Sequence, residues 1–172
     1  MQKKFSYPIK IDELNQNQYH FEIIADKEER EDIKQILQVE DVRGLRGDIY
    51  LKYDKKNNLL RVWGSVSAVL ILQSVISLEN FKQKIKTPFE LFFDTKATYK
   101  DIHDMENSIN DEVPDIIEKG EINLADICIE QIALQLDDYP RAEGEEFYYE
   151  TPDVHSYKGK ENPFAILQKL KK

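Results

Sequence analysis

The stretch Leu60-Arg61-Val62-Trp63-Gly64-Ser65-Val66-Ser67-Ala68 decides how this chain folds, because apolar and polar side chains alternate along it. Successive side chains of a β-strand point to opposite faces, so this alternation predicts a strand with one buried face. Leucine, valine and alanine fill the buried face, and Arg61, Trp63 and the serines take the other. The glycine at position 64 indicates a bulge or the close approach of another backbone.

The flanking sequence continues the pattern. Alternation from Asp48 to Asp54 predicts a preceding strand, and Lys55-Lys56-Asn57-Asn58 is typical of a turn. The apolar run from Val69 to Leu78 extends the central strand, and another alternating strand starts at Phe81 before Pro88 interrupts it. We therefore expect an α+β domain, in which an antiparallel meander of about four strands, with scope to curl toward a barrel, is packed by two to three helices.

The N-terminal part predicts an edge strand and a short helix. Phe5 to Ile11 is compatible with an edge strand, where a proline is tolerated. Asp26-Lys27-Glu28-Glu29 has the pattern of a capping box, in which residues 26 and 29 satisfy each other's backbone amides. The helix that follows should end near Gln38. It should bury one narrow apolar stripe, formed by Ile33, Ile36 and Leu37.

Two further helices are expected toward the C-terminus. Asn123 is a favourable cap for the first, and Asp126 places a negative charge in its first turn, where the helix dipole favours it. Its apolar face, which must pack on the sheet, comprises Leu124, Ile127, Cys128, Ile132 and Leu136. Asn162-Pro163 has the cap and first-position proline that open a last short helix.

Charge is divided unevenly along the chain. Residues 42–100 contain 11 Lys and Arg against 5 Asp and Glu, whereas residues 101–155 contain 2 against 17. The basic part suits phosphate groups and the acidic part suits basic proteins, although either can simply be a solvated face. We expect residues 1–172 to form a single domain with acidic mobile segments at about 99–121 and 141–159.

The sequence contains no Walker loop, nucleophile elbow or HExxH motif. Cys128 is the single cysteine, and its apolar helical setting favours a buried thiol. Of the histidines His20, His103 and His155, only the second has nearby carboxylates, in an acidic stretch better explained as a solvated loop. We expect no metal, no cofactor and no enzymatic activity. No apolar run approaches a membrane span, and the N-terminus lacks a signal sequence, so a cytoplasmic protein is expected.

One local pattern has a functional alternative. Gly44-Leu45-Arg46-Gly47 has the spacing of the GXXG loop with which KH domains clamp a nucleic-acid backbone. That loop lies between two helices, whereas here a strand is predicted to follow. We therefore interpret these residues as a turn into the strand.

Three segments, in this order along the chain, carry recognisable motifs: Val62 to Glu79, Ile122 to Arg141, and Asn162 to Leu167. The motif residues are Gly64, Ser74, Ser77, Leu78, Glu79, Asp126, Glu130, Tyr139, Pro140, Asn162, Pro163 and Phe164. Together these segments resemble the YceD-like family, known as large ribosomal RNA subunit accumulation proteins.

This chain departs from many members of the family at one place. They carry C-x-R-C-L where this sequence has Ser74-Val75-Ile76-Ser77-Leu78, and the ending is similar to an alphaproteobacterial-type branch lacking the cysteine motif. Serine is a poor zinc ligand beside a thiolate, so no metal or redox role of those cysteines carries over. The resemblance implies a bacterial protein that supports accumulation or processing of large-subunit (23S) rRNA, has a link to a large-subunit ribosomal protein and has no established enzymatic activity.

The first functional hypothesis is a ribosome biogenesis factor that contacts rRNA through its basic sheet. The three lysines at positions 82, 84 and 86 share one strand face and form a plausible phosphate track, while Trp63 or Tyr50 is placed to stack on an unpaired base. The plain alternative is that alternating lysines protect a sheet from aggregation. The candidate contacts are Arg43, Arg46, Lys52, Lys55, Lys56, Arg61, Trp63, Lys82, Lys84 and Lys86.

Two other hypotheses remain open. In the second, the acidic arm from Asp101 to Asp153 binds or chaperones a basic ribosomal protein without direct RNA contact, using interleaved aromatic residues as anchors. The third is a ribonuclease, which requires an acid/base pair or clustered metal-binding carboxylates. No such set can be nominated from this sequence, so the third hypothesis is the least favoured.

Overall fold

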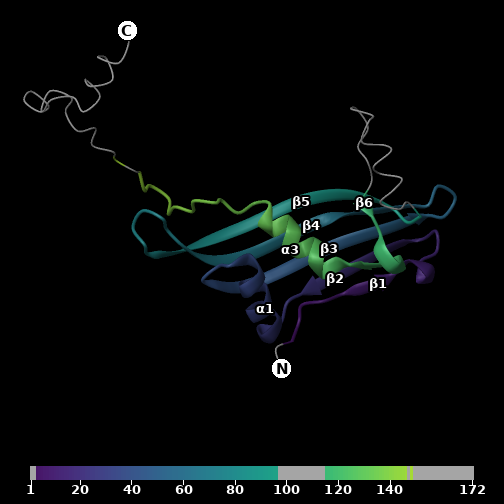
Figure 1. Ribbon diagram of the computed structural model, residues 1–172, viewed down its shortest axis with the longest axis horizontal. Helices are drawn as coiled ribbons and strands as arrows, with labels where there is room; N and C mark the ends of the chain where they lie inside the picture. Colours follow the sequence, from purple (N-terminus) through teal and green to yellow (C-terminus); the bar gives the residue numbers. More distant parts are fainter. Residues whose placement is uncertain (1–2, 97–114, 147, 149–172) are drawn as a thin grey trace, which may run out of the picture.

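The structure is a computed structural model that describes residues 3–96, 115–146 and 148. Four antiparallel strands form a meander, and a short strand joins its far edge in parallel, in the order β2-β3-β4-β5-β6 (Figure 1). This confirms the α+β prediction and the four-stranded meander. The strands are β2 (Gln18–Ile24), β3 (Asp41–Asp54), β4 (Leu59–Gln73), β5 (Asn80–Asp94) and β6 (Asp115–Ile116).

The alternation along β4 separates the two faces of the sheet as predicted. Leu60, Val62 and Val66 are fully buried and Ala68 is nearly so, whereas Arg61 is exposed and Trp63 is half-buried. The buried face of the sheet joins apolar residues of both helices in one hydrophobic core. The other face is left without a helix in the part of the chain that the structure describes.

A second, two-stranded sheet lies beside the first. Strand β1 (Pro8–Lys10) pairs with β7 (Glu121–Asn123). The short helix η1 (Ile11–Glu13) follows β1, and the short helix η2 (Glu118–Gly120) precedes β7. The expected strand at residues 5–11 is therefore shorter and does not edge the main sheet. Residues 115–121, placed in an acidic mobile segment, form β6, η2 and the start of β7, while residues 99–114 lie outside the described part.

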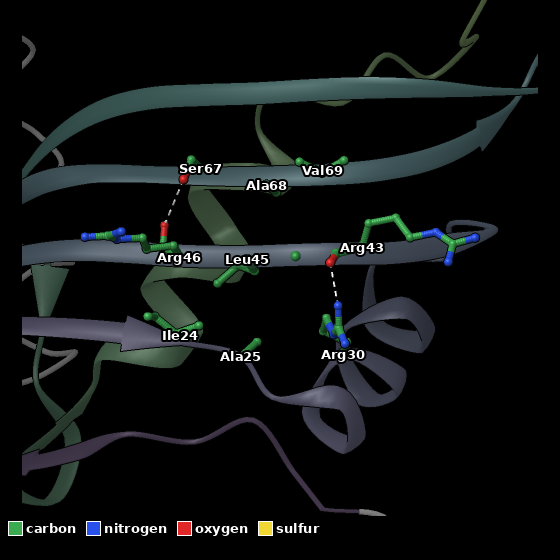
Figure 2. A pocket seen from close by; sticks show the side chains of 10 residues that line it. Ile24, Ala25, Arg30, Arg43, Leu45, Arg46, Ser67, Ala68 and Val69 are labelled. Carbon is green, nitrogen blue, oxygen red and sulfur yellow. Dashed lines mark hydrogen bonds between the residues drawn. The ribbon is translucent and has the colours of Figure 1, made fainter.

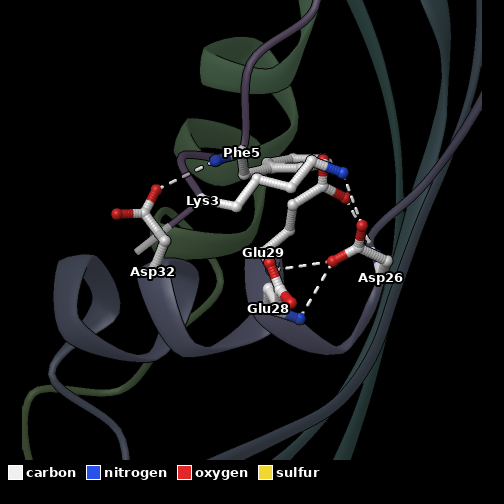
Figure 3. Close-up of polar contacts among 6 residues, drawn as sticks. All are labelled: Lys3, Phe5, Asp26, Glu28, Glu29 and Asp32. Carbon is white, nitrogen blue, oxygen red and sulfur yellow. Dashed lines mark hydrogen bonds and ion pairs between the residues drawn. The ribbon is translucent and has the colours of Figure 1, made fainter. Parts of the chain in front are cut away.

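Helix α1 (Lys27–Leu37) begins with the predicted capping box, which the structure confirms through Asp26 and Glu29. The residues before β1 also contact this helix (Figure 3). Lys3 forms ion pairs with the carboxylates of Asp26 and Glu29, and the amide of Phe5 donates a hydrogen bond to Asp32 over 3.0 Å. The apolar stripe is narrower than expected. Ile33 is fully buried and Leu37 is partly buried, but Ile36 faces solvent and is 53% exposed.

Helix α3 (Leu124–Ala133) packs its apolar face on the sheet, as predicted, and Asn123 caps it by accepting from the amide of residue 125. It ends at residue 133, so Leu136 lies beyond the helix and is only partly buried. Cys128 is fully buried against β3, and this burial raises the pKa of its thiol to about 12. The thiol is therefore a packing group rather than a nucleophile, in agreement with the sequence interpretation.

Three local expectations were wrong. Pro88 does not interrupt a strand. Strand β5 passes through it, beside Ser65 of β4 and with no strand on its other side, since only residues 93 and 94 pair with β6. The central strand ends at Gln73, and a turn follows where an apolar run was expected. Residues 44–47, interpreted as a turn, lie within β3, where a register shift between Val42 and Gly44 marks a bulge.

Two glycines permit close approaches that any side chain would block. A Cβ at Gly47 would lie 2.6 Å from the sulfur of Cys128, and a Cβ at Gly64 would lie 2.0 Å from the carbonyl oxygen of Asp48. A Cβ at Gly44 would meet nothing within 4 Å. The first two positions therefore allow the helix–sheet and strand–strand contacts, and the third provides a matched control.

We predict that Gly47→Ala lowers the free energy of unfolding by about 1–3 kcal/mol, the usual cost of overpacking, and that Gly64→Ala costs at least as much. Gly44→Ala should stay within about 0.5 kcal/mol of the parent protein. Urea denaturation measures all three. The double variant Gly47→Ala with Cys128→Ala should lose less stability than the two single losses combined, because the smaller side chain relieves the contact. Simple additivity would contradict the close approach.

Candidate nucleic-acid interface

The open face of the main sheet gathers most of the predicted contact residues. We use "open face" for the side of β2–β5 that carries Trp63, opposite the helices. The strand register aligns its side chains in rows across the sheet. One row is His20, Tyr50, Trp63 and Glu90; one end of the face has the row Gln18, Lys52, Arg61 and Phe92; toward the other end lies the row Ile24, Arg46, Ser67 and Lys86.

The aromatic row is a continuous stack. The ring centroids of His20 and Tyr50 are 4.5 Å apart, and those of Tyr50 and Trp63 are 5.7 Å apart, with interplanar angles of 17° and 19°. The guanidinium of Arg61 lies 4.6 Å from the Trp63 ring centroid, in a cation–π contact. Tyr50 is therefore stacked between His20 and Trp63 in the middle of the open face, and the guanidinium of Arg61 covers a face of the Trp63 ring.

His20 was missed as a site residue because the sequence was searched for histidines with nearby ligands. Its imidazole Nε2 hydrogen-bonds a carboxylate oxygen of Asp48 over 2.5 Å, and its neighbour in the row is Tyr50, thirty positions along the chain. Only the pairing register of β2 with β3 reveals this neighbour. The alternation along residues 18–24, for which no strand was predicted, is the signal that could have placed the ring on a sheet face.

The predicted arginines are paired with carboxylates on the surface. Arg46 pairs with Glu22 at 2.8 Å and Arg61 with Glu90 at 2.5 Å, both across strands. Arg43 pairs with its neighbour at position 41, also at 2.8 Å. Exposed pairs of this kind contribute about 0–1 kcal/mol, so an arriving phosphate can replace the carboxylates at little cost.

The predicted lysines lie at two ends of the open face. Lys82, Lys84 and Lys86 are exposed on one side of β5, as expected, and form no salt bridge within residues 3–96 and 115–146. Lys52 lies on β3, three rows away from Lys86, a separation of roughly 20 Å along the strands. Lys55 and Lys56 belong to the turn between β3 and β4. The candidate basic residues therefore form two clusters, one on each side of the aromatic row along the strands.

Acidic residues approach the β5 end from one side. Lys82 and Lys84 line a shallow pocket together with Asp137, Arg141 and Glu143, from the segment that follows α3. No hydrogen bond or ion pair links the two sides among the described residues. The lysine ammonium groups therefore remain available, beside negative charges that lower the local potential.

Ser74 and Ser77, two of the residues that carry the family resemblance, stabilise the turn between β4 and β5. Ser74 is fully buried, its hydroxyl donates to the carboxylate of Glu145, and the amide of Val75 donates to the carbonyl of Pro140 over 2.9 Å. Hydrogen bonds from Ser74 and Ser77 hold the pKa of Glu145 below its usual value. This cluster, which we call the serine clasp, joins the turn to the segment after α3.

The other residues behind the resemblance have varied positions. Leu78 is exposed with a left-handed backbone, and the carbonyl of Glu79 accepts from the amide of Ser74. Asp126 lies in the first turn of α3 as expected, and Glu130 has a raised pKa because of partial burial and two nearby carboxylates. Tyr139 is exposed. Asn162, Pro163 and Phe164, with the helix expected there, lie outside the described residues.

The described residues contain no group of three or more histidine, cysteine or acidic side chains arranged to hold a metal ion. Among their helices, none has the length and apolarity to cross a membrane. His103, His155 and residues 149–159 of the expected acidic segments fall outside the described part. The open face carries stacked rings, guanidinium groups and ammonium groups.

We predict that Glu145→Ala destabilises the protein at pH 7 and that this effect fades at acidic pH. The pKa of Glu145 is lowered by the serine clasp, so the clasp stabilises the fold above the ordinary glutamate pKa and is lost as pH falls through the lower, folded value. Urea denaturation of both proteins from pH 7 to pH 3 measures the difference. Glu143→Ala, an exposed neighbour, serves as control. A difference that is independent of pH would refute the role of the carboxylate.

A family model described as "Large ribosomal RNA subunit accumulation protein YceD" matches residues 62–171. The matched region starts in β4, so it includes Trp63 and the three lysines of β5 but not β2, α1 or β3. No curated protein and no solved structure matches the chain.

Proposed function

Because this chain belongs to the YceD family of large ribosomal RNA subunit accumulation proteins, we propose that it contacts large-subunit rRNA directly through the open face. In this role it is a non-enzymatic ribosome biogenesis factor of the bacterial cytoplasm, folded as a single domain. The observation that carries the proposal is the aromatic row of His20, Tyr50 and Trp63, which lies between two clusters of basic side chains.

The open face suits unpaired RNA better than a duplex. The bases of a duplex are stacked on each other, whereas a single strand can lay its bases on aromatic rings and its phosphates on neighbouring cations. A base can stack on Trp63 by replacing the Arg61 guanidinium over that ring, and Lys86, Lys84 and Lys52 provide cations on both sides of the row. A single-stranded rRNA segment crossing β5, β4 and β3 would meet both types of group.

Protection against aggregation explains only part of this surface. Lysines on the exposed side of β5 do discourage edge-to-edge pairing, and that role requires no aromatic residue. A stack of three rings, of which His20 is exposed and Tyr50 and Trp63 are half-buried, works in the opposite direction, because it adds apolar area to a solvent-facing sheet. The combination of rings and cations therefore favours a ligand with both bases and phosphates.

We predict that the triple reversal of Lys82, Lys84 and Lys86 to glutamate strongly weakens binding to single-stranded RNA from the large-subunit rRNA. Removing three phosphate contacts should also reduce the slope of log affinity against log salt by roughly 2. Fluorescence anisotropy of a labelled RNA at several salt concentrations measures both quantities.

The matched control reverses three exposed lysines away from the open face, Lys4, Lys10 and Lys119. It changes net charge by the same amount, so it separates a local contact from general repulsion of RNA. The proposal requires the control to bind much better than the β5 variant. Equal binding by both variants would show that β5 makes no local contact.

We predict that Trp63→Ala weakens RNA binding by about 1–3 kcal/mol, the usual contribution of one stacked base, while Trp63→Phe retains most of the affinity. Trp63 is the single tryptophan of the chain, so its fluorescence reports on the open face directly. Addition of RNA should quench it. Unchanged fluorescence at RNA concentrations that saturate binding would place the RNA elsewhere.

A second candidate function is an acidic module for a basic ribosomal protein. It is favoured by Leu134, Tyr139 and Tyr148, which are 73%, 70% and 82% exposed and lie among carboxylates. Large exposed apolar side chains beside negative charge are typical of a surface that binds a basic partner. Changing Asp137, Asp138, Glu143 and Glu146 to their amides should abolish capture of such a protein after RNase treatment. Unchanged capture would exclude this surface.

A further inference from the structure

A pocket opens where helix α1 meets the bulge of β3, next to the open face. Its volume is about 390 Å³. Figure 2 shows β3 and β4 crossing it, with α1 on one side. Its floor is apolar and its rim carries three arginines. The residues that line it are Ile24, Ala25, Arg30, Arg43, Gly44, Leu45, Arg46, Ser67, Ala68 and Val69.

Arg30 is the unusual member of this group. Its Nη1 donates to the carbonyl oxygen of Arg43, as Figure 2 shows, but its Nε is buried without a hydrogen-bond partner. It forms no salt bridge within the described residues. A guanidinium carries five N–H donors and a charge that requires compensation, so leaving a donor buried and unpaired is costly. An anionic group in the pocket would compensate the charge of Arg30 through the other N–H groups of its guanidinium.

The pocket stays open at the bulge because residue 44 is a glycine and has no side chain to fill it. Gly44 follows the register shift in β3, and a side chain there would meet nothing within 4 Å. Arg43 and Arg46 extend away from the pocket in opposite directions along the strand (Figure 2). Each is held by one surface ion pair, to Asp41 and Glu22 respectively, and such weak pairs let the side chains turn inward.

We propose that this pocket binds one nucleotide, with its phosphate on Arg30 and the two rim arginines and its base on the apolar floor. The inference rests on the proposed function, in which the nucleotide belongs to the bound RNA strand. The row that contains Arg46 lies two rows from the aromatic row, roughly 13 Å along the strands, so one short single strand can reach both. The same chemistry would accept a free nucleotide.

The test uses two variants of the full chain that act by different means. Arg30→Met removes the charge and keeps an apolar stem, and Gly44→Leu fills the pocket without altering charge. Each should weaken binding of a fluorescein-labelled single-stranded RNA 12-mer about tenfold. The double variant should be little worse than either single variant, because both remove the same contact. Gly44→Ala is the control, and thermal unfolding confirms that each variant folds.

A titration with AMP, followed by NMR, tests the pocket independently of the RNA strand. Shifts of the amide signals of Ala25, Gly44 and Val69 that disappear in Arg30→Met support a nucleotide site, even for a chain that binds no RNA. RNA binding that survives both pocket variants but fails in the β5 lysine variant overturns the pocket and leaves the proposed function standing. Absence of both AMP shifts and any effect of the two variants overturns it as well.

Discussion

The close packing of helix α3 on the sheet is the constraint on which the rest of the structure depends. The sulfur of Cys128 occupies the space that a side chain at Gly47 would need, so the helix lies close against β3. This contact and the apolar face of α3 bury one side of the meander in the hydrophobic core. Because α1 packs on the same side, the opposite face has no covering element among the described residues, and the proposed RNA contact is assigned to it.

Strand pairing then determines what that surface contains. Long, well-registered strands bring His20, Tyr50 and Trp63 into one stack, although the chain separates them widely. The same register places basic side chains on either side of the stack. A bulge at Gly44 opens a pocket at the margin, where α1 supplies Arg30. The anchoring of α1 by Lys3 and its capping box therefore also positions an arginine of the proposed RNA surface.

Three elements were predictable from sequence because their signals are local. Alternation in β4, the capping box at Asp26 and the cap at Asn123 each need only a few neighbouring residues, and the structure confirms all three. The row with His20 and the pocket with Arg30 were not predictable, because they depend on which residues face each other across strands. Pro88 misled for the same reason: whether a proline interrupts a strand depends on which neighbours its amide would face.

The central claim is that rRNA lies on the open face, and ultraviolet crosslinking tests it most directly. The tagged protein would be irradiated in native lysate, purified under denaturing conditions and digested, and the peptides joined to RNA would be identified by mass spectrometry. The account predicts crosslinks to large-subunit rRNA at peptides from β3, β4 and β5, with Tyr50 and Trp63 among the modified residues. Crosslinks confined to α1, α3 or the β1–β7 sheet, or no rRNA crosslink at all, would contradict it.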